Sequence, residues 1–403
     1  MHTLMKQAQE PIPFIIDKSL ATQFKKEFDE KKVKVFEKYE VLGFISSGTY
    51  GRVYKAISKN KNDRRFFAIK KFKSDKDEEA SRNSGISQSA CREIGLCSEL
   101  NHVNIISLEE VALQNRSIYM VFKYVDYDFQ QIIHHHTYTE KKPVPESTIK
   151  SLMWQLINGV CYLHENWVMH RDLKPANVLV TSDGIVKVGD LGLARSFFRP
   201  IQPLYNSDKV VVTVWYRAPE LILGSKHYTK AIDMWSVGCI FGEFLTGKPM
   251  FKGEELRNEK KGFPFQKDQM SKIIEVLGNP TKEDWPDLEF MPDYREMCLL
   301  KSHFNNLRSV FTACHVKDEA AFDLLKKLLI YDPKKRITAV EALSHVYFRQ
   351  DPKPTSNAFA GQPYKYLPRK LTQLDSKTMK SDHIPRRNAG SSRAKPLSKR
   401  VKK

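Results

Sequence analysis

Apolar residues recur at helical spacing in three stretches of the chain. Residues 87–100 place Ile94, Cys97 and Leu100 three residues apart, which predicts a helix with one apolar face. Residues 17–38 alternate apolar positions with lysines and acids, which predicts a charged amphipathic helix. The strongest pattern lies in residues 145–165, whose apolar stripe consists of Ile149, Leu152, Met153, Leu156, Val160 and Leu163.

Strand patterns follow the helix predicted in residues 17–38 and return after the helix predicted in residues 87–100. From Tyr39 the pattern becomes that of a strand, and residues 41–45 lead into a glycine-containing turn. Residues 117–122, SIYMVF, predict a further strand. The polar, glycine-containing residues 81–87 precede the helix of 87–100, so we expect that helix to be able to move.

The amphipathic helix predicted in residues 17–38 must bury its apolar stripe. Leu20, Phe24 and Phe28 recur at i, i+4 and i+8. Two interpretations remain open from the pattern alone. The stripe docks on the chain's own strand-rich region, or it forms a surface for a partner helix.

Residues 170–192, HRDLKPANVLVTSDGIVKVGDLG, contain the densest candidate chemistry. Asp172, Asn177 and Asp190 bring two carboxylates and a carboxamide to one loop and the turn after it. Phosphoryl transfer needs a group that orients the attacking hydroxyl and oxygen ligands for magnesium. A solvated acidic loop is the alternative, and the joint spacing of these residues with Lys174 disfavours it.

This stretch resembles the catalytic segment of the eukaryotic protein kinases. The resemblance implies an α+β, two-lobed fold with a mainly-β N-lobe, one regulatory helix and a mainly-α C-lobe. It implies that Asp172 accepts the substrate hydroxyl proton and that Asn177 and Asp190 bind Mg²⁺ beside ATP. Lys174, in DLKPAN, is typical of Ser/Thr kinases. Leu191 replaces the usual Phe of the D-F-G motif.

The turn at residues 46–53, SSGTYGRV, resembles the glycine-rich loop that covers ATP phosphates. Gly48 and Gly51 allow backbone N–H groups to approach phosphates, and Ser46 replaces the first glycine of the pattern. By the same resemblance, residues 123–127 form a hinge that holds adenine, with Phe122 at the back of the pocket. The expected nucleotide-binding residues are Ile45, Ser46, Gly48, Thr49, Gly51, Val53, Ala68, Lys70, Phe122, Tyr124, Val125, Asp128 and Leu179.

Lys70, in the sequence AIK, matches the strand lysine that binds the α- and β-phosphates and pairs with a helix glutamate. Glu93 is the candidate partner on the helix of residues 87–100. Glu99 is the alternative, and we expect it to face water. Lys70 and Glu93 therefore join Asp172 and Lys174 as predicted catalytic residues.

The stretch VVTVWYRAPE resembles the cyclin-dependent kinases, whose substrate Ser or Thr is followed by Pro. Asp208 stands where those kinases carry an activating Thr. We expect its carboxylate to contact Arg92, Arg171 and Arg195. One carboxylate carries less charge than a phosphate and leaves the arginines partly unpaired. We therefore expect either that an acid from a partner completes the cluster or that the loop is weakly ordered. An ordinary loop acid is the alternative, and Ser207 is a further candidate phosphorylation site.

Four further stretches resemble one branch of the cyclin-dependent kinases, the branch that pairs with cyclin C in the Mediator complex. They are SACRE, HYTKAID, KRITAVEAL and DPKPTSNAFAG. The resemblance extends from about Phe24 to Gly361. It implies a nuclear Ser/Thr kinase with a cyclin C-like cyclin and Mediator kinase-module subunits as partners, and favours the partner role of the N-terminal helix. Its implied substrates are transcription proteins, including the RNA polymerase II C-terminal repeat. A pseudokinase-like scaffold and a partner-independent kinase are the alternatives.

Charge is concentrated at the C-terminus. The formal net charge is +19, and residues 365–403 contain 13 Lys/Arg and 2 Asp/Glu, a net of +11. The tail from residue 367 is expected to be disordered, and residues 386–403 resemble a nuclear import signal. Nucleic-acid binding and a plain solvated tail are the alternatives. Six cysteines without a C-x-x-C pair indicate a reducing compartment, and no apolar run is long enough for a membrane helix.

The predicted organisation follows from these patterns and resemblances. A leader occupies residues 1–16 and the amphipathic helix 17–38. The kinase domain spans 39–348, with the N-lobe at 39–122, the hinge at 123–127 and the C-lobe at 128–348. A C-lobe extension follows at 349–366, and the basic tail occupies 367–403.

Overall fold

The computed structural model describes residues 22–23, 34–47, 51–72, 88–114, 117–197, 214–256, 264–314, 316–361, 366–369 and 371–372. Several predictions concern residues outside this set. They are the leader of residues 1–16, the stripe of Leu20, Phe24 and Phe28, the loop residues Gly48 and Thr49, Ser207 and Asp208, and the tail beyond residue 372.

The small lobe is built on a five-stranded antiparallel sheet with the strand order β1-β2-β3-β5-β4. Successive strand residues point to opposite faces, and one face packs with Val35 and Phe36 of the short helix α2 (Val35–Lys38) into a small separate core. The strands are β1 (Tyr39–Ser47), β2 (Gly51–Ser58), β3 (Phe66–Phe72), β4 (Leu108–Gln114) and β5 (Ser117–Lys123).

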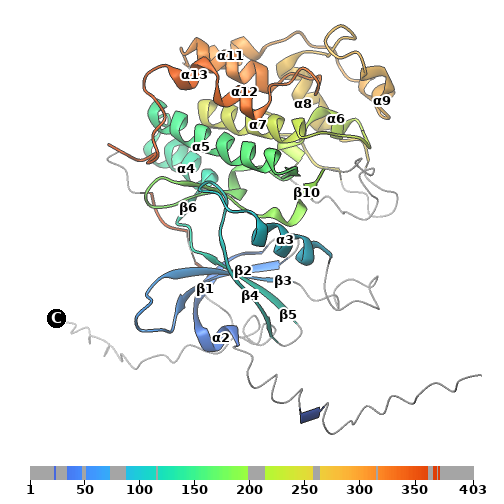
Figure 1. Ribbon diagram of the computed structural model, residues 1–403. Helices are drawn as coiled ribbons and strands as arrows, with labels where there is room; N and C mark the ends of the chain where they lie inside the picture. The colour runs from blue at the N-terminus through green and yellow to red at the C-terminus, as the bar shows by residue number, and fades with distance from the viewer. Residues whose placement is uncertain are drawn as a thin grey trace, which may run out of the picture.

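Helix α3 (Gln88–Glu99) lies between this sheet and the helical lobe (Figure 1). Its bounds agree closely with the helix predicted over residues 87–100. Glu93 and Cys97 are buried on its inner side, whereas Glu99 is exposed, as expected. The helix therefore presents a buried carboxylate toward the region where the two lobes meet.

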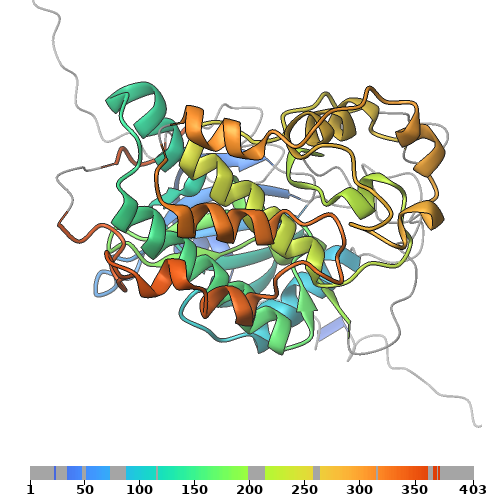
Figure 2. The same cartoon turned by 90° about the horizontal axis from the view of Figure 1, so that it is seen from above.

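The large lobe is mainly helical and is organised around α5 (Glu146–Glu165) and α7 (Ala231–Thr246). All six apolar positions of the stripe predicted in residues 145–165 are buried. Helices α8 and α9 gather at one end of this lobe (Figure 2). The other α-helices are α4 (Phe129–His134), α6 (Pro219–Ile222), α8 (Lys267–Leu277), α9 (Tyr294–Cys298), α10 (Leu307–Ala313), α11 (Glu319–Leu328), α12 (Ala339–Leu343) and α13 (Val346–Arg349).

Short strands in the large lobe carry the catalytic segment. A three-stranded sheet has the order β6-β8-β9, with β6 (Tyr127–Asp128), β8 (Val178–Val180) and β9 (Val186–Val188). Strand β7 (Val168–Met169) pairs with β10 (Arg195–Ser196). Residues 170–177 therefore lie between paired strands, and the predicted two-lobed α+β fold is confirmed.

One buried ion pair links distant parts of the large lobe. Arg336 donates through both terminal nitrogens to the Glu220 carboxylate, at 2.9 and 3.0 Å. Further bonds reach the carbonyls of Ala231, Tyr331 and Ile330, so the guanidinium is fully used. Both side chains are almost completely buried.

The chain remains on the domain beyond residue 366, where the basic tail was predicted to begin. Thr372 forms an isolated antiparallel bridge with Phe44 of β1, and Arg369 forms an ion pair with Asp128. The predicted tail boundary is therefore wrong for Arg369, Leu371 and Thr372. The Arg369–Asp128 ion pair and the backbone bridge of Thr372 hold these residues on the domain, although the segment has few apolar side chains to bury.

No helix within the described residues combines the length and apolar character needed to cross a membrane.

Removing one member of the Glu220–Arg336 pair leaves the other charge uncompensated in the core. We expect Arg336→Met to lower the free energy of unfolding by about 3–5 kcal/mol, measured by urea denaturation. Lys272→Met is the control, because it breaks an exposed pair with Glu275 and should leave the midpoint nearly unchanged. Equal losses in the two variants would contradict the assignment of the effect to burial.

Candidate functional site

A pocket of about 570 Å³ lies where the two lobes meet, and most of the predicted site residues line it. Small-lobe strands, the hinge and the catalytic segment all contribute. Gly48 and Thr49 are outside the described residues. The predicted residues that line the pocket are Ile45, Ser46, Gly51, Val53, Ala68, Lys70, Glu93, Phe122, Tyr124, Val125, Asp128, Asp172, Lys174, Asn177, Leu179 and Asp190.

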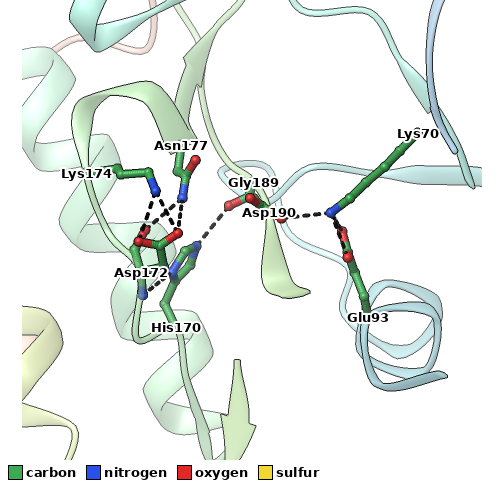
Figure 3. Close-up of polar contacts among 8 residues, drawn as sticks. All are labelled: Lys70, Glu93, His170, Asp172, Lys174, Asn177, Gly189 and Asp190. Carbon is green, nitrogen blue, oxygen red and sulfur yellow. Dashed lines mark hydrogen bonds and ion pairs between the residues drawn. The ribbon is translucent and has the colours of Figure 1, made fainter. Parts of the chain in front are cut away.

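Lys70 of β3 connects three elements at the inner end of the pocket. Its Nζ lies 2.7 Å from both carboxylate oxygens of Glu93 on α3. It also lies 2.8 Å from Oδ1 of Asp190, which follows β9 (Figure 3). The structure therefore brings the expected Lys70–Glu93 pair together, with Asp190 as a second carboxylate on the same ammonium.

The electrostatics of this group follow from burial and mutual attraction. Burial alone would lower the pKa of Lys70, but the carboxylates of Asp190 and Glu93 reverse the effect and raise it. Burial raises the pKa of Glu93, although Lys70 opposes the rise. Burial would also raise the pKa of Asp190, but Lys70 outweighs it and holds that pKa below its usual range. Asp190 thus remains an anion, as a metal ligand must.

Leu191 follows Asp190 and is fully buried at the start of the 3-10 helix η4 (Leu191–Leu193). Asp190 itself has φ 58°, in the left-handed region that non-glycine residues rarely adopt. The strained backbone directs the carboxylate toward Lys70 while the next side chain enters the core. An aliphatic residue at this position therefore still provides the buried anchor for the turn.

Asp172 occupies the other side of the pocket with two neighbours from the same loop. Lys174 Nζ lies 2.9 Å from Oδ2 and 3.2 Å from Oδ1 of its carboxylate. Asn177 Nδ2 donates to Oδ2 at 3.0 Å and to the Asp172 backbone carbonyl at 2.8 Å. Burial raises the pKa of Asp172, and Lys174 counteracts this rise.

The side chains of Asn177 and Asp190 fit a magnesium site. Both amide hydrogens of Asn177 are directed to Asp172, so its carbonyl oxygen is left to face another group. Carboxylate and carbonyl oxygens are the ligands that Mg²⁺ prefers. These two residues would hold the ion, which would offset the charge of bound phosphates.

A buried carboxylate that the sequence analysis did not assign to the site holds the catalytic loop in place. Asp233 of α7 accepts from the backbone N–H groups of His170 and Arg171, at 2.9 and 2.8 Å. His164 Nε2 lies 2.9 Å from the same carboxylate. Arg171 has φ 71°, so these bonds stabilise a loop with a strained backbone.

His170 links the two halves of the site. The backbone N–H of Asp172 donates to His170 Nδ1 at 3.2 Å, so Nδ1 acts as an acceptor. His170 Nε2 then carries the hydrogen and donates to the Gly189 carbonyl at 2.9 Å. The imidazole of His170 therefore bridges the loop that carries Asp172 and the residue before Asp190.

The hinge end of the pocket combines apolar side chains with polar ones such as Asp128. Phe122 is buried at the back, as expected, and Ala68 and Leu179 contribute from opposite lobes. The Tyr124 N–H is already bonded to the Phe66 carbonyl at 3.0 Å. Of the hinge amides proposed to hold adenine, that of Val125 is therefore the better candidate.

Gly51 is needed for close backbone packing beneath the glycine-rich loop. A Cβ at this position would lie 2.4 Å from the Lys71 carbonyl oxygen, a distance that real contacts do not reach. Glycine is thus required where β1 turns into β2. Ser46 lies on β1, lines the pocket and pairs with Val53 of β2, directly after a register shift between Phe44 and Ser46.

The predicted regulatory cluster is only partly described. Arg92 lies on α3, Arg171 in the catalytic loop and Arg195 on β10, and each is half-buried. Asp208, to which they were expected to point, lies outside the described residues. The cluster as a whole therefore stays a prediction.

Comparison with known proteins finds protein kinases, by a family model and by similar sequences. Residues 39–348 match the family model described as "Protein kinase domain". The chain is 53% identical over 371 residues to "Serine/threonine-protein kinase SSN3" of Yarrowia lipolytica, covering 91% of this chain and 92% of that protein. It is 52% identical over 374 residues to "Serine/threonine-protein kinase ssn3" of Aspergillus terreus, covering 88% of this chain and 86% of that protein.

Replacing Lys70 by Met leaves Glu93 buried without its cation, so the native state would hold Glu93 protonated. The native state then binds one more proton than the unfolded state between the unfolded and folded pKa values of Glu93. Stability should therefore fall as pH rises through that window, by about 1.4 kcal/mol per pH unit. We expect urea denaturation to show a larger loss, relative to the parent chain, at about pH 7.5 than at about pH 5.5.

The control for this measurement is Lys61→Met, which removes a positive charge from an exposed turn. Its effect on the free energy of unfolding should be small at both pH values. A loss for Lys70→Met that does not depend on pH would contradict the role of Lys70 in keeping the buried Glu93 carboxylate ionised.

Proposed function

Since this chain belongs to the protein kinase family, and its close relatives are Ser/Thr kinases, we propose that it transfers the γ-phosphate of ATP to Ser or Thr residues followed by Pro. The observation that carries the proposal is the convergence in one pocket of Lys70, Glu93 and Asp190 with Asp172 and Asn177. No catalytic atom that phosphoryl transfer requires is missing from this set.

Each side chain has a defined part in the proposed reaction. Asp172 orients the substrate hydroxyl and accepts its proton, and Lys174, 2.9 Å away, stabilises negative charge beside it. Lys70, held by Glu93, binds the α- and β-phosphates. Asn177 and Asp190 supply magnesium ligands, and the ion would neutralise the charge that develops on the phosphates.

Burial of Asp172 raises the pKa of the proposed base. The raised pKa of Asp172 makes its carboxylate a stronger base than an exposed aspartate, while Lys174 keeps it ionised near neutral pH. Asn177 fixes its orientation through two hydrogen bonds. The carboxylate is therefore presented in one geometry before the substrate arrives.

We infer further that the kinase requires a cyclin C-like cyclin. Glu93 lies on α3, so a partner that positions this helix would control the Lys70–Glu93 pair. The proposed partner surface also includes the predicted helix of residues 17–38, with Leu20, Phe24 and Phe28. An acid from the partner would complete the cluster of Arg92, Arg171 and Arg195 together with Asp208.

The resemblance to the cyclin C-dependent branch also supports a place for this chain in the Mediator kinase module. On this proposal the enzyme acts in the nucleus on transcription proteins, including the RNA polymerase II C-terminal repeat. The basic residues after 372 would serve nuclear import, and contact with nucleic acid is the alternative for them. A pseudokinase-like scaffold is not favoured, because the catalytic side chains are present and converge.

Phosphate transfer from ATP to a Ser-Pro peptide tests the proposed activity, with and without a cyclin C-like partner. We expect activity only with the partner, and a fall in kcat of about 10²–10⁴-fold for Asp172→Asn. Asp190→Asn should also abolish transfer. Asp183→Asn, which alters an exposed carboxylate in a turn, is the matched control and should retain activity.

Other outcomes of the same assay would change the proposal. Activity without the partner would indicate that Asp208 alone suffices to order the activation segment. Nucleotide binding without transfer under either condition would favour the scaffold.

The partner surface has its own test. Replacing Leu20, Phe24 and Phe28 together by Ser should weaken cyclin binding at least about tenfold, because three buried apolar side chains would be lost. Surface plasmon resonance with immobilised cyclin measures the change. Replacing Thr22 and Gln23 by Ala, in the same stretch, is the control. Unchanged affinity for the triple variant would exclude this helix from the interface.

A further inference from the structure

Two short segments near the C-terminus, residues 366–369 and 371–372, lie across the junction of the lobes, and we call them together the strap. At the large-lobe end, Tyr366 is buried and its hydroxyl lies 3.0 Å from His136 Nε2. Its ring packs against Tyr127 and Phe359, with centroids 5.7 and 5.0 Å away. After α13, Phe359 packs edge-on against Tyr127 of β6, with ring centroids 6.0 Å apart.

The other end of the strap lies on the small lobe. The Thr372 N–H donates to the Phe44 carbonyl at 3.0 Å, and the Phe44 N–H donates to the Thr372 carbonyl at 3.1 Å. Strand β1 is at the edge of its sheet, so this bridge covers part of an open edge. Gly43 permits the approach, because a Cβ there would lie 3.0 Å from the Leu371 Cβ.

Arg369 lies between these two anchors and reaches the pocket. Its NH2 group is 3.3 Å from Oδ2 of Asp128 and 3.3 Å from the Tyr127 carbonyl. Arg369 is also one of the residues that line the pocket. Its Nε is buried and has no hydrogen-bond acceptor within the described part of the chain.

Asp128 is held from two sides. Its Oδ1 accepts from the Gln131 N–H at 2.8 Å and so caps the start of α4. Its Oδ2 faces Arg369. Burial raises the pKa of Asp128, and Arg369 opposes this effect, so the cation helps to keep the carboxylate ionised as a hydrogen-bond acceptor.

We propose that Arg369 is a positioning residue of the nucleotide pocket, which fixes Asp128 for the sugar of the bound nucleotide and, through the strap, joins the small lobe to the hinge. The inference rests on the proposed function, because it takes Asp128 as a nucleotide contact. The adenine would lie deeper, beside Phe122 and Val125, so Arg369 acts on the sugar end of the ligand. The C-terminal segment is then a wall of the active site.

The test compares Arg369→Ala, Arg369→Lys and the parent chain, each full-length and with its cyclin. Isothermal titration calorimetry gives the Kd of Mg²⁺–ADP and adenosine, and displacement of ADP gives that of adenine. We expect Arg369→Ala to weaken ADP and adenosine about tenfold, the loss expected for one charge-assisted hydrogen bond, and to leave adenine unchanged. KM for ATP should rise with kcat nearly constant, and Arg369→Lys should recover part of the affinity.

Arg349→Ala is the matched control, since it removes an exposed arginine of α13 that does not line the pocket. Thermal unfolding without ligand shows that each variant is folded, and the lysine variant provides the test if the alanine variant is not. Unchanged ADP affinity, or equal weakening of adenine and adenosine, would overturn the inference. Failure of the parent chain to bind nucleotide at all would overturn the proposed function as well.

Discussion

The active arrangement depends on one ammonium group shared by two carboxylates from different parts of the chain. Lys70 belongs to the small-lobe sheet, Glu93 to α3 and Asp190 to the segment after β9. If α3 moved away, Glu93 would leave a buried cation partly uncompensated, and the position of Asp190 would lose its support. The electrostatic cost of separating these charges therefore couples the sheet, the helix and the turn that carries Asp190.

Buried polar groups play a corresponding part in the large lobe. Asp233 binds two backbone N–H groups of the catalytic loop, and Arg336 binds Glu220 with three carbonyl groups. Each group is satisfied by several partners, which is the condition under which buried charge is tolerated. The strained conformations of Arg171 and Asp190 are maintained by this surrounding framework.

Much of this arrangement could be predicted from the sequence. Helical periodicity located α3 and α5, because each buries one face against a large core. The spacing of Asp172, Asn177 and Asp190 indicated the site, because one loop and one turn hold all three. The Glu93 assignment, made over Glu99, agrees with its burial and its contact with Lys70.

Contacts between residues far apart in sequence could not be predicted in the same way. Asp233 lies about sixty residues after the loop that it supports, and no local pattern connects the two. Arg369 was placed in a disordered tail because its neighbours are polar and basic. Its position depends on one ion pair and one backbone bridge, which leave no periodic signal.

The position of Arg369 also affects the order in which the enzyme becomes complete during synthesis. The ribosome releases the small lobe first, then the hinge and the catalytic loop, and Arg369 only after residues 39–348. The pocket therefore gains the wall that Arg369 forms only after the whole region that matches the kinase family has emerged. A recombinant chain ended at residue 348, where the match to the kinase family stops, would contain the catalytic residues but would lack this wall.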